Sequence, residues 1–184
     1  MNMKAILSIP SFLLTVLFFA ACGPEPQQPH FKPFEKDTLK ESIIEVNKRQ
    51  VNDEALQINN YVTRHGLDVT ITQTGLRYTI YKKSTKNGPL ATGGDVALVH
   101  YTCYLLNGDE VYTSRKTGPV EILVDRDNVE SGVHEGLKYM RVGDKAKFIL
   151  PSHLAHGVVG DENKIPPLTP VVFDIEMISL NKNK

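Results

Sequence analysis

The feature that most limits the fold is a change of hydrophobic period at Gly66. Before this glycine apolar residues recur at helical spacing, and after it they alternate with polar residues. Turn-forming stretches such as Asn107-Gly108-Asp109 separate the alternating segments. The alternation predicts half-buried antiparallel strands. Its apolar positions are Leu76, Tyr78 and Ile80; Val99, Tyr101, Cys103 and Leu105; Val120, Ile122 and Val124; Ala146, Phe148 and Leu150; and Val171, Phe173, Ile175 and Met177.

One short helix interrupts these strands. In the stretch 128–140 the residues Val129, Val133, Leu137 and Met140 fall on one helical face, and Asn128 is a candidate N-cap. A single helix across an antiparallel sheet makes an α+β domain. The sheet must bend around the helix, so we expect a core between them and a pocket where the core ends.

A helical segment at 36–66 precedes the sheet. Its apolar positions are Leu39, Ile43 and Val46, then Ala55, Ile58 and Val62. Asn52-Asp53-Glu54 can cap a second helix, so the pattern is compatible with one helix or two, and Gly66 ends it. The apolar face either packs on the domain or pairs with a second copy, which would make a homodimer through 36–66.

The first 35 residues are expected to lie outside the fold. Lys4 precedes an apolar run that ends at Ala21, which is typical of a signal peptide over 1–21. The run FFAAC, ending at Cys22, resembles a bacterial lipobox, which implies cleavage before Cys22 and its lipidation. A secreted protein and an uncleaved anchor helix are the alternatives. Residues 22–35 are proline-rich and predict an extended tether. Because Gly23 rather than Asp follows the cysteine, we expect a cell-envelope lipoprotein on the outer membrane.

Composition and motifs exclude several classes of function. Lys+Arg and Asp+Glu both number 21, so no basic face for nucleic acid is expected. With Cys22 lipidated, Cys103 has no partner and is interpreted as a small buried apolar residue. His153 and His156 lie near Asp161, but no further ligand completes a metal site, and no cofactor motif is present.

Three longer stretches resemble FKBP-type peptidyl-prolyl isomerases. These are VHYTCYLLNGDEVYTS at 99–114, GVHEGLKYMRVGDKAKFILPSHLAHG at 132–157 and IPPLTPVVFDIEMISL at 165–180. The resemblance covers about 70–181 and implies a domain at 67–184, an antiparallel half β-barrel wrapped on one helix. It also implies isomerisation of X-Pro bonds in proline-containing polypeptides, among them exported proteins that need help in folding. The lipobox and helical lead-in resemble gliding-motility-associated lipoproteins.

The resemblance also implies the site. Tyr101, Phe173 and His156 match positions that act on the peptide, and Pro166-Pro167 would stiffen the rim of the pocket. Further residues that match substrate-binding positions are Val111, Tyr112, Val120, Val129, Glu130, Val133 and Ile165.

Four of these positions depart from the family pattern. Tyr112 stands where Asp is usual, Val133 where a large aromatic residue is usual, and His156 where a loop Tyr is usual. Glu130 replaces an aliphatic residue. These departures leave a second interpretation open, in which the domain is a weakly active or inactive binding module of a cell-surface motility or secretion machine.

Overall fold

The computed structural model describes residues 36–85 and 87–183. The expected signal peptide, Cys22 and the tether at 22–35 lie outside the described residues. Within the described ranges no helix is both long enough and apolar enough to cross a membrane. The elements are, in chain order, α1 (Lys36–Arg64), β1 (Thr70–Ile71), β2 (Arg77–Lys82), β3 (Val96–Leu105), β4 (Glu110–Thr113), β5 (Val120–Leu123), α2 (Ser131–Leu137), β6 (Lys145–Leu150), the 3-10 helix η1 (Ser152–Leu154) and β7 (Val171–Asn181).

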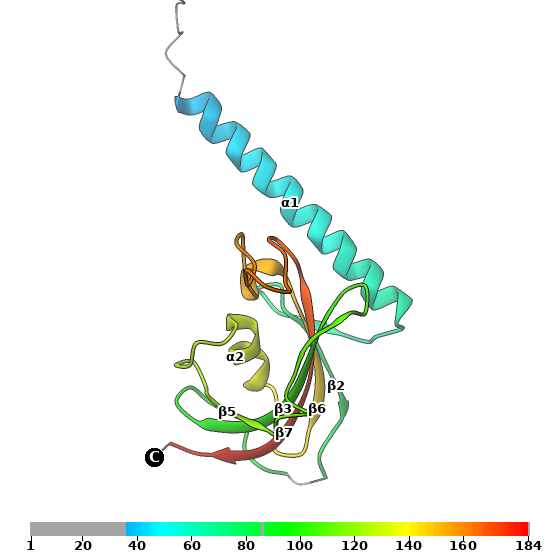
Figure 1. Ribbon diagram of the computed structural model, residues 1–184, viewed down its shortest axis with the longest axis vertical. Coiled ribbons are helices and arrows are strands. Elements are labelled where there is room, and N and C mark those ends of the chain that lie inside the picture. Colours follow the sequence, from blue (N-terminus) through cyan, green and yellow to red (C-terminus); the bar gives the residue numbers. More distant parts are fainter. Residues whose placement is uncertain (1–35, 86, 184) are drawn as a thin grey trace, which may run out of the picture.

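The strands form one antiparallel sheet that curves around α2 (Figure 1). Its order is β1-β2-β6-β7-β3-β4, and β5 pairs with β3. The long strand β3 pairs with β7 on one side and, on the other, with β5 through its first half and with β4 through its second half. The expected α+β fold, an open antiparallel sheet around one short helix, is confirmed. The alternation did not indicate β1, which has two residues, or β4, in which Val111 and Tyr112 are adjacent and break the alternation.

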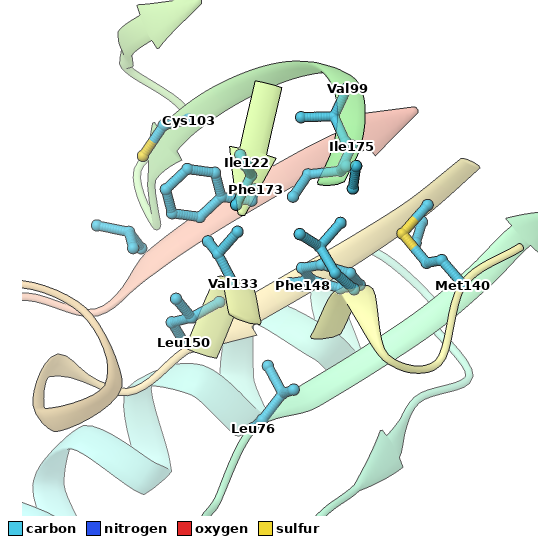
Figure 2. Packing of buried hydrophobic residues seen from close by; sticks show 14 of the residues in the cluster. Leu76, Val99, Cys103, Ile122, Val133, Met140, Phe148, Leu150, Phe173 and Ile175 are labelled. Atoms are coloured by element: carbon cyan, nitrogen blue, oxygen red, sulfur yellow. The ribbon is translucent and has the colours of Figure 1, made fainter. Parts of the chain in front are cut away.

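The main core lies between α2 and the concave face of the sheet. Val133 of α2 points toward Phe173 of β7 in this cluster (Figure 2). Two glycines let the helix lie close to β6. A Cβ at Gly136 would stand 2.4 Å from the ring of Phe148, and a Cβ at Gly132 would stand 2.6 Å from Leu150. Only a residue without a side chain fits such a close approach.

The helix α2 is shorter than the sequence pattern predicts. It begins at Ser131 rather than at the expected cap Asn128, and Glu130 occupies the N-cap position without a side-chain cap. The chain before it is held by local turns, in which the Asp127 carboxylate accepts a hydrogen bond from the Leu123 amide at 2.6 Å. Past Leu137 the chain turns, yet Met140 is still fully buried, so the apolar face was predicted correctly and the ends were not.

The helix α1 is continuous and packs on the opposite face of the sheet. Ile58 and Tyr61 form a second cluster with Ile149 of β6 and Val172 of β7. Of the two apolar triplets in the sequence, the one around Ile58 covers the sheet. The other triplet, Leu39, Ile43 and Val46, is exposed where α1 extends away from the sheet (Figure 1).

A buried carboxylate ties α1 to the loop after β6. Glu54 is only 4% exposed, and its carboxylate accepts hydrogen bonds from the amide and the hydroxyl of Ser152, the latter at 2.9 Å. Ser152 begins η1, which leads into the loop that carries His156. The helix α1 therefore helps to place one side of the site described next.

Candidate functional site

A small apolar cavity opens between α2 and the concave face of the sheet. Its volume is about 120 Å³. An apolar cavity of about 150 Å³ holds benzene, so a space of this scale suits one small apolar ring. Its lining residues are Tyr101, Cys103, Tyr112, Val120, Ile122, Val129, Glu130, Val133, Phe173 and Ile175.

Two aromatic side chains form a corner of this cavity. The rings of Tyr101 on β3 and Phe173 on β7 have centroids 6.0 Å apart and are tilted by 47°. None of the described residues bonds the Tyr101 hydroxyl. Burial, and then the negative charge of Glu130, raises the pKa of Tyr101, so the hydroxyl stays protonated at neutral pH. The cavity thus offers one free hydrogen-bond donor beside apolar walls.

Ser114, which sequence reasoning missed, fixes the backbone of Tyr101. Its hydroxyl accepts a hydrogen bond from the Tyr101 amide at 2.9 Å, and its amide donates to the Tyr101 carbonyl at 3.0 Å. The side chain of Ser114 is 1% exposed. Nothing in the sequence indicates that Ser114, just after β4, forms hydrogen bonds with the backbone of Tyr101 on β3.

The lining of the cavity includes three residues that were not predicted as site residues. Cys103, Ile122 and Ile175 alternate with polar neighbours on the same strands as Tyr101, Val120 and Phe173, and that shared face was the signal available in the sequence. Burial raises the pKa of the Cys103 thiol, as does the nearby charge of Glu130, so the thiol is not a nucleophile at neutral pH.

Three predicted residues do not line the cavity itself. Val111 and Ile165 are buried in the core cluster beside it. His156 lies at its edge, in contact with the lining residue Glu130. The remaining predicted residues are lining residues.

One rim of the cavity is built around Asp161. One oxygen of its carboxylate accepts hydrogen bonds from the amides of Ile165, Lys164 and Asn163, at 2.6, 2.9 and 3.0 Å. The other oxygen accepts a hydrogen bond from the hydroxyl of Tyr112. Burial alone would raise the pKa of Asp161, but these hydrogen bonds together hold it well below its usual range. The bond to Asp161 in turn raises the pKa of Tyr112.

The loop that follows Asp161 is closed on itself. The Asp161 amide donates to the Ile165 carbonyl at 3.0 Å, and the Leu168 amide donates to the Gly157 carbonyl at 2.9 Å. Gly160 has φ +76°, and a Cβ there would stand 2.3 Å from the Ile165 carbonyl oxygen. The loop with Pro166-Pro167 is therefore held in one shape. Its contact with the cavity is the hydrogen bond between Asp161 and the lining residue Tyr112.

A second rim carries Glu130 and His156. Glu130 Oε1 lies 3.0 Å from His156 Nε2, and the two side chains are 18% and 24% exposed. This is a close polar contact without an aligned hydrogen bond, since the ring nitrogen has no hydrogen-bond partner among the described residues. His153 points elsewhere, with Nε2 2.9 Å from the Thr74 carbonyl.

Comparison with known proteins shows that this part of the chain matches a protein family. The model of the family described as "FKBP-type peptidyl-prolyl cis-trans isomerase" matches residues 88–178, which span α2 and every strand from β3 to most of β7. The cavity-lining residues all fall inside the matched range.

Individual relatives agree with this match. A probable FKBP-type peptidyl-prolyl cis-trans isomerase of Haemophilus influenzae is 37% identical over 117 residues, covering 63% of this chain and 47% of that protein. FK506-binding protein 2 of Dictyostelium discoideum is 39% identical over 89 residues, covering 48% of this chain and 67% of that protein. The match therefore spans about half the length of the bacterial relative.

Solved structures show the same architecture. The crystal structure of FkpA from Escherichia coli has a TM-score of 0.62 at 27% identity, covering 80% of this chain and 68% of that one. A peptidyl-prolyl cis-trans isomerase from Pseudomonas syringae also has a TM-score of 0.62 at 27% identity, covering 73% of this chain and 96% of that one.

Proposed function

The chain belongs to the FKBP-type peptidyl-prolyl cis-trans isomerase family, and we propose that it catalyses rotation about X-Pro peptide bonds in other polypeptides. The observation that carries this proposal is the apolar cavity of about 120 Å³ with Tyr101 and Phe173 at its corner. Its size suits the pyrrolidine ring of a proline. The described residues that line it include no nucleophile activated by a neighbouring base, and rotation about an amide needs none.

The chemistry requires only that the twisted amide be bound better than the planar one. Rotation breaks amide resonance, with a barrier of about 18–20 kcal/mol. The planar amide has the larger charge separation, so the apolar walls disfavour it relative to the twisted form. Binding that strengthens toward the transition state raises kcat. The residues Val129, Val133 and Phe173 hold the proline ring, while the rest of the peptide lies across the mouth of the cavity.

Tyr101 supplies a hydrogen bond to the bound peptide. Its hydroxyl is protonated and is not used by the described part of the fold. A donor held by Ser114 on a rigid strand can orient a peptide carbonyl without reorganisation. His156 stands on the same side as Glu130 and shapes the mouth of the cavity.

Two observations support a second candidate, a binding module with weak catalysis. Tyr112 replaces the usual acid, and its hydroxyl donates to Asp161 and accepts from the side-chain amide of Asn163, so this position offers the peptide no free carboxylate. Val133 leaves the floor without a large ring. Such a domain would bind proline-containing segments of a cell-surface motility or secretion machine without turning them over quickly.

Isomerisation of short X-Pro peptides by the purified chain tests the proposal. Two-dimensional exchange NMR measures cis-trans interconversion directly. We expect the wild-type chain to accelerate isomerisation. In Tyr101→Phe the acceleration should be about tenfold smaller, which corresponds to the loss of one hydrogen bond, and in Phe173→Ala it should be largely lost. Tyr81→Phe, which removes a hydroxyl bonded to Asp174 at 2.7 Å, is the matched control. A folded wild-type protein with no acceleration on any peptide would leave the binding module as the function.

Attachment to the cell envelope is a further part of the proposal. The apolar run before Cys22 supports export followed by lipidation, which would tether the domain to the outer membrane, where it assists folding of exported proteins. Mass spectrometry of the mature N-terminus tests this. An unmodified Cys22 would end the lipid-anchor proposal and leave the isomerase proposal intact.

A homodimer through 36–66 is supported by the exposed half of α1. Leu39, Ile43 and Val46 are all exposed there. Light scattering of the purified chain measures its mass, and Ile43→Asp should convert a dimer into a monomer. A wild-type mass of one chain would contradict the dimer.

A further inference from the structure

Glu130 is an acidic residue in the lining of a mostly apolar cavity. Among the described residues that line this cavity it is the one with a carboxylic acid side chain, and none of them is Lys, Arg or His. Its neighbours there are aliphatic or aromatic side chains and one thiol. A partly buried carboxylate in apolar surroundings is unfavourable unless a cation or several hydrogen bonds compensate it.

The carboxylate of Glu130 is not compensated by the fold. Within the described ranges its one polar contact is His156 Nε2 at 3.0 Å, which is not an aligned hydrogen bond. Its negative charge is felt by the walls of the cavity, because it adds to burial in raising the pKa values of Tyr101 and Cys103. The group therefore has unused capacity to bind a cation.

Other charges near the cavity do not fill that capacity. Asp161 is committed to backbone amides and to Tyr112. Lys164 is held on that same rim, where its ammonium donates to the Val111 carbonyl at 2.8 Å and lies 5.0 Å from the centre of the Tyr112 ring. Neither group is paired with Glu130. Among the described residues no Lys or Arg is paired with Glu130, so a basic side chain of a bound peptide can take that place.

We propose that Glu130 selects substrates with a Lys or Arg next to the proline. This inference rests on the proposed function. When a proline ring fills the cavity, the residues on either side of it leave through the mouth, where Glu130 and His156 lie. A long basic side chain can rest its methylene groups on the apolar rim while its charged end meets the carboxylate. It then replaces His156 as the partner of Glu130.

The test compares three peptides that differ only in the residue before proline, which is Lys, Leu or Glu. A second set varies the residue after proline. Exchange NMR with the purified full chain gives kcat/KM for each. We expect the Lys peptide of one set to exceed the Glu peptide by about tenfold or more, the size of one partly buried charge pair. In Glu130→Gln this ratio should fall to within about twofold of one.

A matched variant separates local charge from net charge. Glu121→Gln removes the same charge from an exposed position on β5, beside the lining residues Val120 and Ile122. We expect it to keep the wild-type ratio. If Glu130 has a purely structural role, Glu130→Gln should lower kcat/KM for all peptides by the same factor and leave the ratio of Lys to Glu peptides unchanged. That result would overturn the proposal. An equal loss of preference in both variants would also overturn it, because that result indicates net charge alone.

Affinity keeps the test independent of catalysis. If no peptide is turned over, the proposed isomerase function fails, and NMR titration of the same peptides still measures charge preference at the cavity. Tighter binding of the Lys peptide that is lost in Glu130→Gln supports the proposal. Equal affinities of the Lys and Glu peptides for the wild-type protein overturn it.

Discussion

The two rims of the cavity each carry a carboxylate, and the two carboxylates differ in how many hydrogen bonds the fold donates to them. Asp161 receives hydrogen bonds from backbone amides on one oxygen and from Tyr112 on the other. Glu130 receives no aligned hydrogen bond from the described residues and has a single close polar contact, with His156. Asp161 is therefore a structural group that shapes the rim, while Glu130 remains available to an incoming peptide.

This difference shows how a departure from the family pattern is accommodated. Tyr112 stands where the resemblance implies an acid, yet a carboxylate is still present nearby, because Asp161 reaches Tyr112 from the facing loop. That carboxylate now fixes the loop instead of facing the peptide. The acidic side chain that lines the cavity lies on the other rim, at Glu130, and we propose that this is the one a bound peptide meets.

Removing the Asp161 carboxylate should have the largest effect on stability. Asp161→Ala leaves three amides and the Tyr112 hydroxyl without their acceptor, and a hydrogen bond to a charged group contributes about 1.5–3 kcal/mol. We expect the free energy of unfolding, measured in urea, to fall by about 2–3 kcal/mol. Asp68→Ala, at an exposed position, is the control. A loss no greater than that of the control would show that the rim does not depend on Asp161.

The same interaction predicts a pH dependence. The pKa of Asp161 is lower in the folded chain than in the unfolded chain, so its contribution is complete above the unfolded value of about 3.9 and is lost as the pH falls below it. The difference in unfolding free energy between wild type and Asp161→Asn should therefore be constant from about pH 5 to 7, where the carboxyl is ionised in both states, and should shrink on acidification. A difference that grows as the pH falls would contradict the assignment.

A smaller loss is expected when only the link between β4 and the loop is removed. Tyr112→Phe deletes the hydroxyl that donates to Asp161 and keeps the ring in the cavity. The free energy of unfolding should decrease by about 1 kcal/mol. The variant should also expose the loop amides of 163–165 to faster hydrogen exchange. Unchanged exchange at these amides would indicate that the loop is held without Tyr112.

The smallest change in stability is expected at Glu130. Glu130→Gln removes a charge that has no aligned hydrogen bond, so the free energy of unfolding should change by no more than about 0.5 kcal/mol. Thermal unfolding at neutral pH is sufficient to measure this. A clear loss of stability would mean that the contact with His156 holds the rim together and that Glu130 is structural, like Asp161.

Alternation in the sequence predicted most of the sheet, and the resemblance to the isomerase family implied most of the residues that line the cavity. Alternation places Tyr101 and Cys103 on one face of β3, and Phe173 and Ile175 on one face of β7, because side chains of a strand point to opposite faces in turn. The same rule would have added Ile122 beside Val120. The ends of α2 were not predicted, because the turn at 125–128 depends on contacts such as that of Asp127 with Leu123.

Long-range contacts explain what the sequence could not show. Val172 and Ile149 are fully buried on the far face of the sheet because α1 packs there, and no strand period identifies which helix covers a face. The contact between Tyr112 and Asp161 joins residues 49 positions apart, and Ser114 bonds across β3 from the end of β4. Such pairings depend on the register of the whole sheet.

The most direct test alters the carboxylate of each rim in turn and measures both stability and substrate preference. Unfolding free energy and the ratio of Lys-Pro to Glu-Pro turnover would be determined for Asp161→Asn and Glu130→Gln side by side. We predict a crossed result, in which Asp161→Asn loses stability and keeps the ratio, while Glu130→Gln keeps stability and loses the ratio. If the two variants change both quantities in parallel, the rims do not have separate roles and the account of the site is wrong.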